Sequence, residues 1–300
     1  MPSKHGHISI CVCTYKRPKL LLHLLKKLQN QTTDNLFTYS IVAVDNDHTQ
    51  SAKSTVAFFK ENSLIDIDYY NEPEQNISLA RNKAVEKSKG NLIAFIDDDE
   101  FPVDDWLLNL YKAYHKFEAD GVLGPVKPYF RVVPPKWIIK GKLLEREKFK
   151  TGTSIDNPKY TRTGNVLISM KTFAQENPVF DPRFGRIGGE DVDLFRRLIE
   201  KGHVFVWCNE APVFEEIGRE RMCREYFINR ALLRGVVNSS DRGLLSFDTV
   251  KSLIAFCIYT SALPALLVVG HHLFMKYLIK DCDHIGKVLA RVGIKVVRER

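Results

Sequence analysis

The chain of 300 residues lacks the short motifs that mark many nucleotide- and nucleic-acid-binding proteins. No G-x-x-x-x-G-K-[ST] sequence occurs, which argues against a P-loop that hydrolyses a nucleotide. No G-x-G-x-x-G follows the first expected strand, which argues against a dinucleotide-binding fold. Zinc-finger, helix-turn-helix and RNA-binding signatures are also missing, so we expect no nucleic-acid partner.

The six cysteines include no C-x-x-C pair and no spacing typical of a metal site. Cys11 and Cys13 lie two residues apart on an expected strand, so both side chains point to one face and are poorly placed to pair with each other. Buried free thiols in a reducing compartment are therefore expected. The N-terminal sequence Met1 to His7 lacks the apolar core of a signal peptide, which predicts a cytoplasmic location.

Basic residues outnumber acidic ones, 44 to 36, which suggests an anionic partner. They are unevenly spread, with concentrations at residues 131–150 and 287–300, and the first half also contains many aspartates. This is not the uniform basic face of a nucleic-acid-binding protein. With 44% hydrophobic residues, the chain can bury one large core, or a core and an appendage.

Apolar strand patterns alternate with helical ones through the first half, which predicts an α/β fold with a mostly parallel sheet between helices. Strands are expected at 8–14, 40–44, 65–70 and 92–96, and helices at 19–29, 52–62, 78–87 and 104–118. Beyond these, strands are expected at 121–130, 164–169 and 203–208, and helices at 192–201 and 219–234. Ligands of such sheets collect at the carboxyl ends of the strands.

Four consecutive carboxylates, Asp97 to Glu100, follow the apolar strand Leu92 to Ile96. Carboxylates crowded at the end of a buried strand repel one another, and a divalent cation such as Mg²⁺ or Mn²⁺ offsets this repulsion. Such an ion usually completes its shell with substrate phosphates. The alternative is a solvated acidic turn that leads into the next helix.

Polar side chains also follow the first and second strands. Tyr15 can stack on a base, Thr14 can hydrogen-bond to it, and Arg17 can attract a phosphate. Alternatively, Tyr15 closes the sheet edge and Arg17 caps a solvated turn. Asp45 and Asn46 suit recognition of a base edge or a ribose hydroxyl.

Two further positions complete the candidate site. Arg81 lies at the start of a helix facing the same crevice, with a surface charge as the alternative. Glu190 and Asp191 follow a glycine-rich turn at a helix N-terminus, where the helix dipole favours ionised carboxylates. A carboxylate there can take a proton from an acceptor hydroxyl. The alternative is a plain N-cap.

Together these residues resemble the family 2 glycosyltransferases, inverting enzymes of the GT-A fold that use nucleotide sugars. The resemblance covers about residues 8–235 and rests on the order of several motifs. These motifs are Cys13-Thr14-Tyr15-Lys16-Arg17-Pro18, Val44-Asp45-Asn46-Asp47, Ser78-Leu79-Ala80-Arg81-Asn82, Phe95-Ile96-Asp97-Asp98-Asp99-Glu100, Thr163-Gly164-Asn165 and Gly189-Glu190-Asp191-Val192-Asp193-Leu194.

The resemblance implies a role for each matched residue. Asp99 would bind a divalent metal (Mn²⁺ or Mg²⁺), and Asp97 the ribose or the metal shell. Asp191 would be the general base, with Glu190 helping to place the acceptor. The nucleotide pocket, for UDP-sugar by default, would be lined by Thr14, Tyr15, Arg17, Asp45, Asn46, Arg81, Asp97 and Asp98.

Two positions depart from the family pattern. Asn46 stands where some members have Asp, which bears on base selectivity. Where some relatives place a His after the base helix, this chain has Val213-Phe214-Glu215-Glu216, and Glu215 is a possible substitute as a metal contact.

Residues 253–270 carry no charge and form a candidate membrane segment, interrupted by Pro264. Basic residues flank it, Arg242 and Lys251 before it and Lys276 and Lys280 after it. A hairpin would keep the basic tail in the cytoplasm, a single span would move it across, and a buried terminal helix is the remaining alternative. We therefore expect a GT-A domain at 1–238 and a membrane-associating segment with a basic tail at 239–300, on the cytoplasmic face of the inner membrane.

The expected function is transfer of a sugar from a nucleotide-diphosphate donor to a glycan or lipid-linked acceptor in surface polysaccharide assembly. The basic, aromatic stretch 131–150 is either an acceptor-binding segment or a solvated loop. Two rival functions are a nucleotidyltransferase of related fold and a non-catalytic, membrane-associated sugar-binding protein.

Overall fold

The computed structural model describes residues 6–237, 247–292 and 294, which divide into two compact units. The first unit comprises residues up to 127 together with 146–215, and the second comprises 128–145 and the chain from 216 onward. The expected boundary between residues 238 and 239 lies outside the described residues. So do residues 1–5, Arg242 and most of the basic tail.

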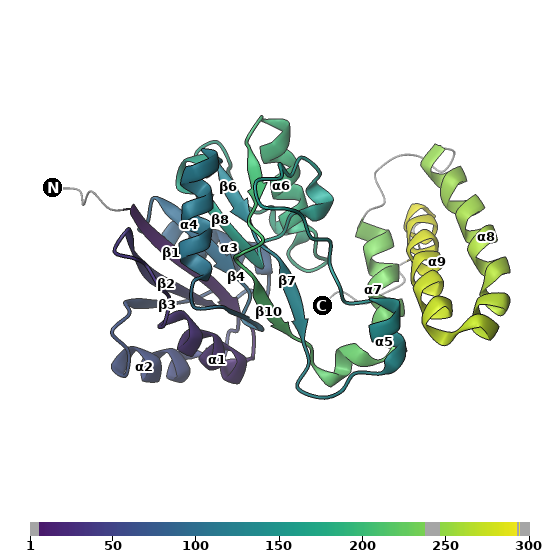
Figure 1. Cartoon of the computed structure of the whole chain (residues 1–300), viewed down its shortest axis with the longest axis horizontal. Helices are drawn as coiled ribbons and strands as arrows, with labels where there is room; N and C mark the ends of the chain where they lie inside the picture. Colours follow the sequence, from purple (N-terminus) through teal and green to yellow (C-terminus); the bar gives the residue numbers. More distant parts are fainter. Residues whose placement is uncertain (1–5, 238–246, 293, 295–300) are drawn as a thin grey trace. The chain divides into compact units, whose positions relative to one another are not determined.

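Seven strands form the central sheet of the first unit: β1 (Gly6–Thr14), β2 (Phe37–Asp45), β3 (Ile67–Asn71), β4 (Leu92–Ile96), β6 (Gly121–Leu123), β8 (Asn165–Ser169) and β9 (Phe205–Trp207). Their order is β3-β2-β1-β4-β8-β6-β9 (Figure 1). The pairs among the first four strands are parallel, as expected, and so is β6 with β9. β8 runs antiparallel to β4 and β6, so the sheet is mixed.

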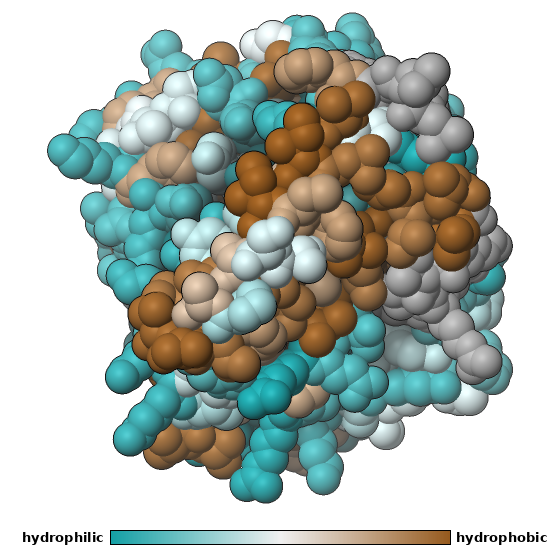
Figure 2. Space-filling view, turned by 90° about the vertical axis from the view of Figure 1, so that its right-hand side faces the viewer, coloured by the Kyte–Doolittle hydropathy of each residue, from teal (hydrophilic) through white to brown (hydrophobic). Residues whose placement is uncertain are grey.

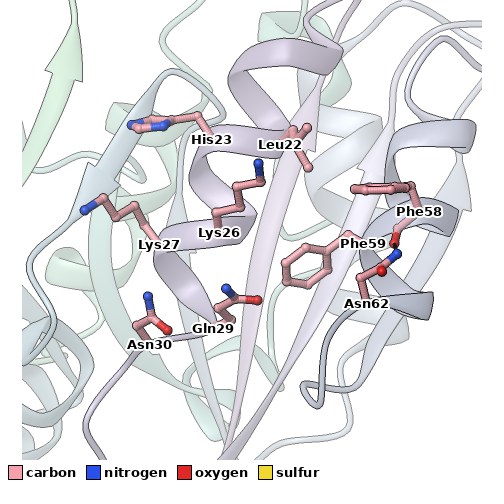
Figure 3. A pocket seen from close by; sticks show the side chains of 9 residues that line it. All are labelled: Leu22, His23, Lys26, Lys27, Gln29, Asn30, Phe58, Phe59 and Asn62. Atoms are coloured by element: carbon pink, nitrogen blue, oxygen red, sulfur yellow. Dashed lines mark hydrogen bonds between the residues drawn. The ribbon is translucent and has the colours of Figure 1, made fainter.

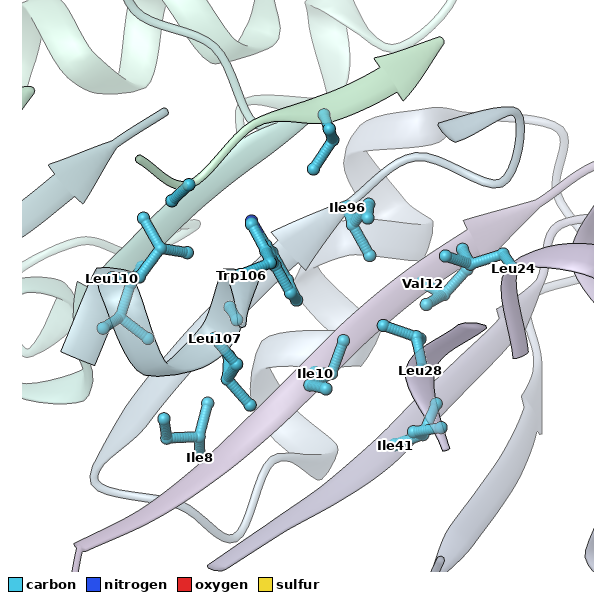
Figure 4. Packing of buried hydrophobic residues seen from close by; sticks show 14 of the residues in the cluster. Ile8, Ile10, Val12, Leu24, Leu28, Ile41, Ile96, Trp106, Leu107 and Leu110 are labelled. Atoms are coloured by element: carbon cyan, nitrogen blue, oxygen red, sulfur yellow. The ribbon is translucent and has the colours of Figure 1, made fainter. Parts of the chain in front are cut away.

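Helices cover both faces of this sheet. α1 (Pro18–Leu28), α2 (Lys53–Glu61) and α4 (Trp106–Phe117) pack on one face, and α3 (Ile77–Lys87) and α6 (Glu190–Glu200) on the other. Alternate residues of β1 supply the two cores, with Ile8, Ile10 and Val12 on the first face (Figure 4). Cys11 and Cys13 both belong to the second core, which confirms that they share a face and shows both thiols free.

Two expected elements are split in the structure. The strand predicted at 121–130 is β6 followed by β7 (Val126–Tyr129), with Gly124 and Pro125 between them. β7 belongs to a second sheet, of order β5-β10-β7, with β5 (Glu100–Pro102) and β10 (Val213–Glu216). The helix predicted at 219–234 is a 3₁₀ turn, Arg219–Met222, followed by α7 (Arg224–Val237).

The second unit is helical, with α5 (Lys136–Gly141), α7, α8 (Phe247–Val269) and α9 (His271–Arg291). Trp137 lies 5.4 Å, between ring centroids, from Phe227 and packs on a small core in this unit. The stretch 131–150 is therefore not simply a solvated loop. Within the described part of the chain, α8 is the one helix long and apolar enough to cross a membrane, judged by length and composition alone.

Candidate functional site

The carboxyl ends of β1, β2 and β4 bring the candidate residues to one edge of the central sheet. Thr14 and Asp45 are register partners at the ends of β1 and β2. The Thr14 hydroxyl donates a hydrogen bond of 2.7 Å to Asp98 Oδ2, just beyond β4. The convergence expected from the sequence is thus present within the first unit.

Asp98 is a buried anchor of this edge rather than part of a solvated turn. Arg17 Nη1 donates to Asp98 Oδ1 at 3.1 Å and to Asp99 Oδ2 at 3.3 Å. Burial raises the pKa of Asp98, and Arg17 and the Thr14 hydroxyl oppose this shift. Glu100 is also buried, so the solvated acidic turn is wrong for two of the four carboxylates.

The remaining carboxylates are crowded around Asp99. Burial, together with Asp97, Asp98 and Glu215, raises the pKa of Asp99 to about 7. Burial, Asp97 and Glu215 also raise the pKa of Glu100 well above its usual value, and Glu215 is its register partner across β5 and β10. Burial and the neighbouring carboxylates therefore oppose ionisation of Asp99 and Glu100 at this edge.

Gly164 allows the carboxylates to approach the chain this closely. A Cβ at this position would lie 2.7 Å from Glu100 Oε1 and 3.1 Å from Asp97 Oδ2. This contact gives a physical reason for glycine within Thr163-Gly164-Asn165. A larger residue would push the acidic side chains apart.

The acidic edge fits a divalent ion in its chemistry, although side chains alone do not complete a site. Carboxylate oxygens are preferred ligands of Mg²⁺ and Mn²⁺, and the mutual repulsion around Asp99 is what a cation relieves. Across the described ranges, no group of three His, Cys, Asp or Glu side chains converges as a ready-made metal site. An ion held here by one or two carboxylates would need its other ligands from a substrate.

Arg81 joins the acidic motif to the Glu190-Asp191 pair. Its guanidinium is buried, donates to Glu190 Oε1, and donates to Asp97 Oδ1 at 3.3 Å. Burial lowers the pKa of Arg81, but Glu190 and Asp97 outweigh burial and the net pKa is raised. The alternative that Arg81 is a surface charge is therefore wrong. Its guanidinium is shared by the acidic motif and the Glu190-Asp191 pair, which lie about 90 residues apart in sequence.

We predict that Arg81→Met destabilises the fold by about 3–5 kcal/mol, because it leaves Glu190 buried without its partner. The double variant Arg81→Met/Glu190→Gln should recover much of this loss, since no uncompensated charge remains at that position. Urea unfolding measures both. The exposed pair of Arg196 with Glu200 is the control, and Arg196→Met should cost at most about 1 kcal/mol. A double variant no more stable than Arg81→Met would contradict the assignment.

Glu190 and Asp191 are the first two residues of α6, and Gly189 is the N-cap. Gly188 and Gly189 have φ angles of +85° and +97°, which glycine adopts without strain. Because Gly189 and neither carboxylate occupies the N-cap position, the alternative that the acidic pair is a plain N-cap is wrong. Asp191 is half-buried and its Oδ1 accepts from the amide of Val192 at 2.7 Å.

The Glu190 carboxylate has one paired and one unpaired oxygen. Oε1 accepts from Arg81, whereas the buried Oε2 has no hydrogen-bond partner among the described residues. Burial raises the pKa of Glu190, with Arg81 acting against the shift and Asp191 adding to it. An unsatisfied buried oxygen is costly, so this atom is available to a ligand's donor.

Asp45 and Asn46 are held inside the chain more tightly than the sequence suggested. Asp45 Oδ2 accepts from the Ala52 amide at 2.7 Å and from the Tyr69 hydroxyl at 3.1 Å. Asn46 Oδ1 accepts from the Asn76 amide at 2.9 Å. These bonds fix the loop after β2. Any contact of Asp45 or Asn46 with a nucleotide would be made in addition to these internal hydrogen bonds.

Tyr15 is half-buried at the end of β1, and the Lys16 ammonium lies 5.1 Å from its ring centroid. Lys16 adopts a φ of +54°, a left-handed conformation that is uncommon for a lysine and marks a tight turn. The turn directs the chain from β1 into α1. In this turn the Lys16 ammonium lies over one face of the Tyr15 ring.

Two further arginines, Arg146 and Arg162, lie at this edge and were not expected from the sequence. Arg146 Nη2 donates to Glu215 Oε2 at 2.5 Å. Arg162 is half-buried, and its side chain forms no hydrogen bond or ion pair with any residue that the structure describes. Burial and the neighbouring Arg146 lower the pKa of Arg162 to about 10. The carboxylates of Asp191, Glu100 and Glu215 act in the opposite direction and raise it. Arg162 directly precedes the motif Thr163-Gly164-Asn165, and this position was the one feature of the sequence that could have pointed to it.

A separate hollow of about 530 Å³ lies between α1 and α2, with Lys26, Phe58 and Asn62 in its wall (Figure 3). None of the candidate site residues lines it. It opens along the second half of α1, away from the residues that follow β1. We assign it no part in the chemistry of the acidic edge.

Comparison with known proteins identifies relatives over most of the chain. The sequence profile of the family described as "Glycosyl transferase family 2" matches residues 9–174. The succinoglycan biosynthesis protein ExoM of Rhizobium meliloti is 31% identical over 238 residues, covering 78% of this chain and 75% of ExoM. The hyaluronan synthase of Pasteurella multocida is 27% identical, over 67% of this chain and 24% of that synthase.

Solved structures resemble the fold. S. aureus TarS 1-349 in complex with UDP-GlcNAc has a TM-score of 0.55 and 14% identity, covering 97% of this chain and 93% of that one. GalNAc-T7 with UDP, GalNAc and Mn²⁺ also has a TM-score of 0.55 and 14% identity, covering 94% and 55%. At this identity the likeness concerns the fold, and it confirms the expected GT-A architecture.

Family membership decides against the two rival functions, the nucleotidyltransferase and the non-catalytic sugar-binding protein. The profile covers more than half of the chain, and ExoM matches along most of both sequences. The profile match, residues 9–174, includes the motifs from Cys13-Thr14 to Thr163-Gly164-Asn165 and ends before Glu190. The chain belongs to glycosyl transferase family 2 and is a glycosyltransferase.

Proposed function

We propose that this glycosyltransferase moves a sugar, with inversion, from a UDP-sugar to a hydroxyl of a glycan or lipid-linked acceptor. One observation carries the proposal: Arg81 hydrogen-bonds to both Asp97 and Glu190, so the acidic motif and the Glu190-Asp191 pair form one site. A donor held by the first motif would present its anomeric carbon to the second.

The donor would lie across the carboxyl ends of β1, β2 and β4. Tyr15 offers a ring face for a base, and Thr14 and Asp98 form a buried polar pair beside it. Arg17, exposed over about half of its side chain, can reach a phosphate. Asp45 and Asn46 hold the loop that closes the far side. UDP is the proposed nucleotide because the TarS and GalNAc-T7 structures contain it.

Asp99 and Asp97 would hold Mn²⁺ or Mg²⁺. When bound, the ion supplies positive charge that stabilises the departing diphosphate. The GalNAc-T7 neighbour contains Mn²⁺, which supports this choice of ion. The protein's own part is to hold the two carboxylates near each other, with Asp97 on Arg81, and burial together with their mutual repulsion raises the pKa of Asp99.

Asp191 would act as the general base. It is half-buried at the first turn of α6, where backbone amides favour an ionised carboxylate. It takes the proton of an acceptor hydroxyl as that oxygen attacks the anomeric carbon from the side opposite the diphosphate. Glu190 Oε2, which has no partner among the described residues, would accept a hydrogen bond from the acceptor and help place it.

Arg162 is proposed to contact the diphosphate, because it is a half-buried guanidinium without an ion-pair partner in the described chain. Arg162→Gln should raise the KM for the donor about 10- to 100-fold, the loss expected for one charge-assisted hydrogen bond. Steady-state kinetics with varied donor measure this. Lys159→Gln, at an exposed position three residues earlier, should leave KM unchanged. An unchanged KM in Arg162→Gln would remove Arg162 from the donor site.

A thermal-shift panel of nucleotide sugars with Mn²⁺ tests the proposed donor class, because a ligand that binds the folded state raises the melting temperature. We expect UDP-sugars to raise it more than ADP-, GDP- or CDP-sugars. The best donor should then yield free UDP in the presence of an acceptor. A panel in which UDP-sugars give no shift would contradict the choice of nucleotide.

The acceptor and location are proposed from relatives and from the second unit. ExoM is named for succinoglycan biosynthesis, and the other curated relatives include hyaluronan and chondroitin synthases, which favours a growing surface polysaccharide as acceptor. We further propose that α8 attaches the enzyme to the cytoplasmic face of the inner membrane. A lipid-linked acceptor would be presented there.

A further inference from the structure

α8 exposes a broad apolar surface, and none of its apolar side chains is fully buried. Its two buried side chains are the hydroxyl-bearing Thr249 and Ser252. A helix of a water-soluble protein buries its apolar stripe against the core, whereas Phe256, Leu263 and Leu266 of α8 are no more than half-buried. The large apolar side chains that α8 exposes are Phe247, Val250, Leu253, Ile254, Ile258, Leu267, Val268 and Val269.

Polar contacts attach α8 to α9 at separated points along its length. Thr260 donates a hydrogen bond of 2.9 Å to Asp281, and Arg291 donates to Thr249 near the start of α8. The rings of Tyr259 and Tyr277 lie 5.7 Å apart between centroids. The two helices therefore run antiparallel and in contact, with α8 as the outer one (Figure 1).

α9 is in turn fixed to α7 by close backbone contact. A Cβ at Gly286 would lie 2.2 Å from the Leu232 carbonyl oxygen, and a Cβ at Gly235 would lie 2.3 Å from the Asp283 carbonyl oxygen. Arg234 also forms an ion pair with Asp283. The three helices thus move as one body, and α8 cannot enter a bilayer without its neighbours.

We propose that α8 lies along the membrane surface, within one leaflet, and does not cross the bilayer. This inference rests on the proposed membrane attachment, and it is independent of the donor and of the general base. A crossing α8 would draw α9 into the hydrocarbon, together with Lys276, Lys280 and Asp283, and charged side chains there are strongly unfavourable. A helix lying flat buries only its apolar outer face.

Charge in the second unit favours an anionic bilayer. Its described residues include fourteen Lys and Arg against seven Asp and Glu, an excess that anionic headgroups attract. Lys276 and Lys280 are exposed on α9, next to the apolar face. Figure 2, viewed from the side on which Figure 1 draws α8, shows apolar side chains gathered in a band.

Vesicle flotation of the full chain tests whether the exposed apolar face of α8 binds a bilayer. The wild type should float with vesicles of phosphatidylcholine and phosphatidylglycerol in equal parts, and less with phosphatidylcholine alone. Ile254→Asp/Ile258→Asp should abolish flotation without lowering the melting temperature, since both side chains are more than half exposed. The control is Leu64→Asp, the same change at a fully exposed residue of the first unit. If the wild type fails to float and instead forms dimers that the double variant disrupts, a second copy covers α8 and the proposal is wrong.

Cysteine labelling then separates a flat helix from a crossing hairpin. In a Cys223→Ser/Cys257→Ser background, His272→Cys marks the turn between α8 and α9, and Lys60→Cys marks the first unit. A membrane-impermeant maleimide should label both markers in inverted vesicles from bacterial cells and neither in spheroplasts. Labelling of the two markers from opposite sides would show that the hairpin crosses. That result would overturn this inference and leave membrane attachment intact, whereas a wild type that fails to float would overturn both. Sugar transfer is assayed separately.

Discussion

Asp191→Asn is expected to abolish sugar transfer while donor binding stays near that of the wild type. The amide keeps the shape of the side chain but cannot take a proton, and loss of a positioned base typically costs about 10²- to 10⁴-fold in rate. Asp191 forms no ion pair in the described chain, and its bond to the Val192 amide can be kept by an asparagine oxygen. The measurements are kcat with saturating donor and acceptor, and donor affinity by calorimetry.

Asp193→Asn is the matched control for this variant. Asp193 is on the same helix, about 200° around the axis from Asp191, and pairs with Arg196 and Arg197. It should keep most of its turnover. Wild-type turnover in Asp191→Asn would remove the base assignment, whereas equal loss in both variants would point to damage of α6.

The second large effect concerns Asp99. We expect Asp99→Asn to lose transfer and also to be more stable than the wild type when no metal is present. Its pKa is raised to about 7 in the folded state. Below about pH 4 the group is protonated in both states and imposes no cost on folding. This advantage in stability is lost as the pH rises through 7, because ionisation is then opposed only in the folded state. At pH 8 the variant avoids a cost of up to about 4 kcal/mol.

Melting temperatures in excess chelator measure this difference, which should be large at pH 8 and small below about pH 4. Adding Mn²⁺ should raise the melting temperature of the wild type but not of Asp99→Asn, and chelator should stop transfer by the wild type. Asp104→Asn changes an exposed carboxylate nearby and should respond to Mn²⁺ as the wild type does. Equal stabilisation of Asp99→Asn by Mn²⁺ would place the ion elsewhere.

Local pattern was sufficient for the strands and helices of the first unit because each segment has a clear period. Leu21, Leu24, Leu25 and Leu28 recur at helical spacing and are all buried, and β4 is a continuous apolar run. The antiparallel direction of β8 was not predictable, because a five-residue apolar strand reads the same in either direction. Likewise, nothing in the run 121–130 required β7 to leave the main sheet.

Motif order predicted which residues gather at the site, but not how they contact one another. Arg81 is an ordinary helix residue in the sequence, and its contacts with Asp97 and Glu190 depend on α3 and α6 covering the same face of the sheet. Arg162 was missed for the same reason, since a lone arginine carries no pattern. The internal bonds of Asp45 were also invisible, because its partners Ala52 and Tyr69 come from two different elements.

Motif spacing and local pattern were enough to predict the family, the order of elements and the identity of the reactive side chains, because these depend on composition and spacing along the chain. Tertiary structure decided which charges share a buried site, because electrostatic energy depends on distance in space and on exclusion from water. It likewise decided the character of α8. At 23 residues the helix is long enough to cross a bilayer, and only its contacts with charged α9 favour a position along the surface.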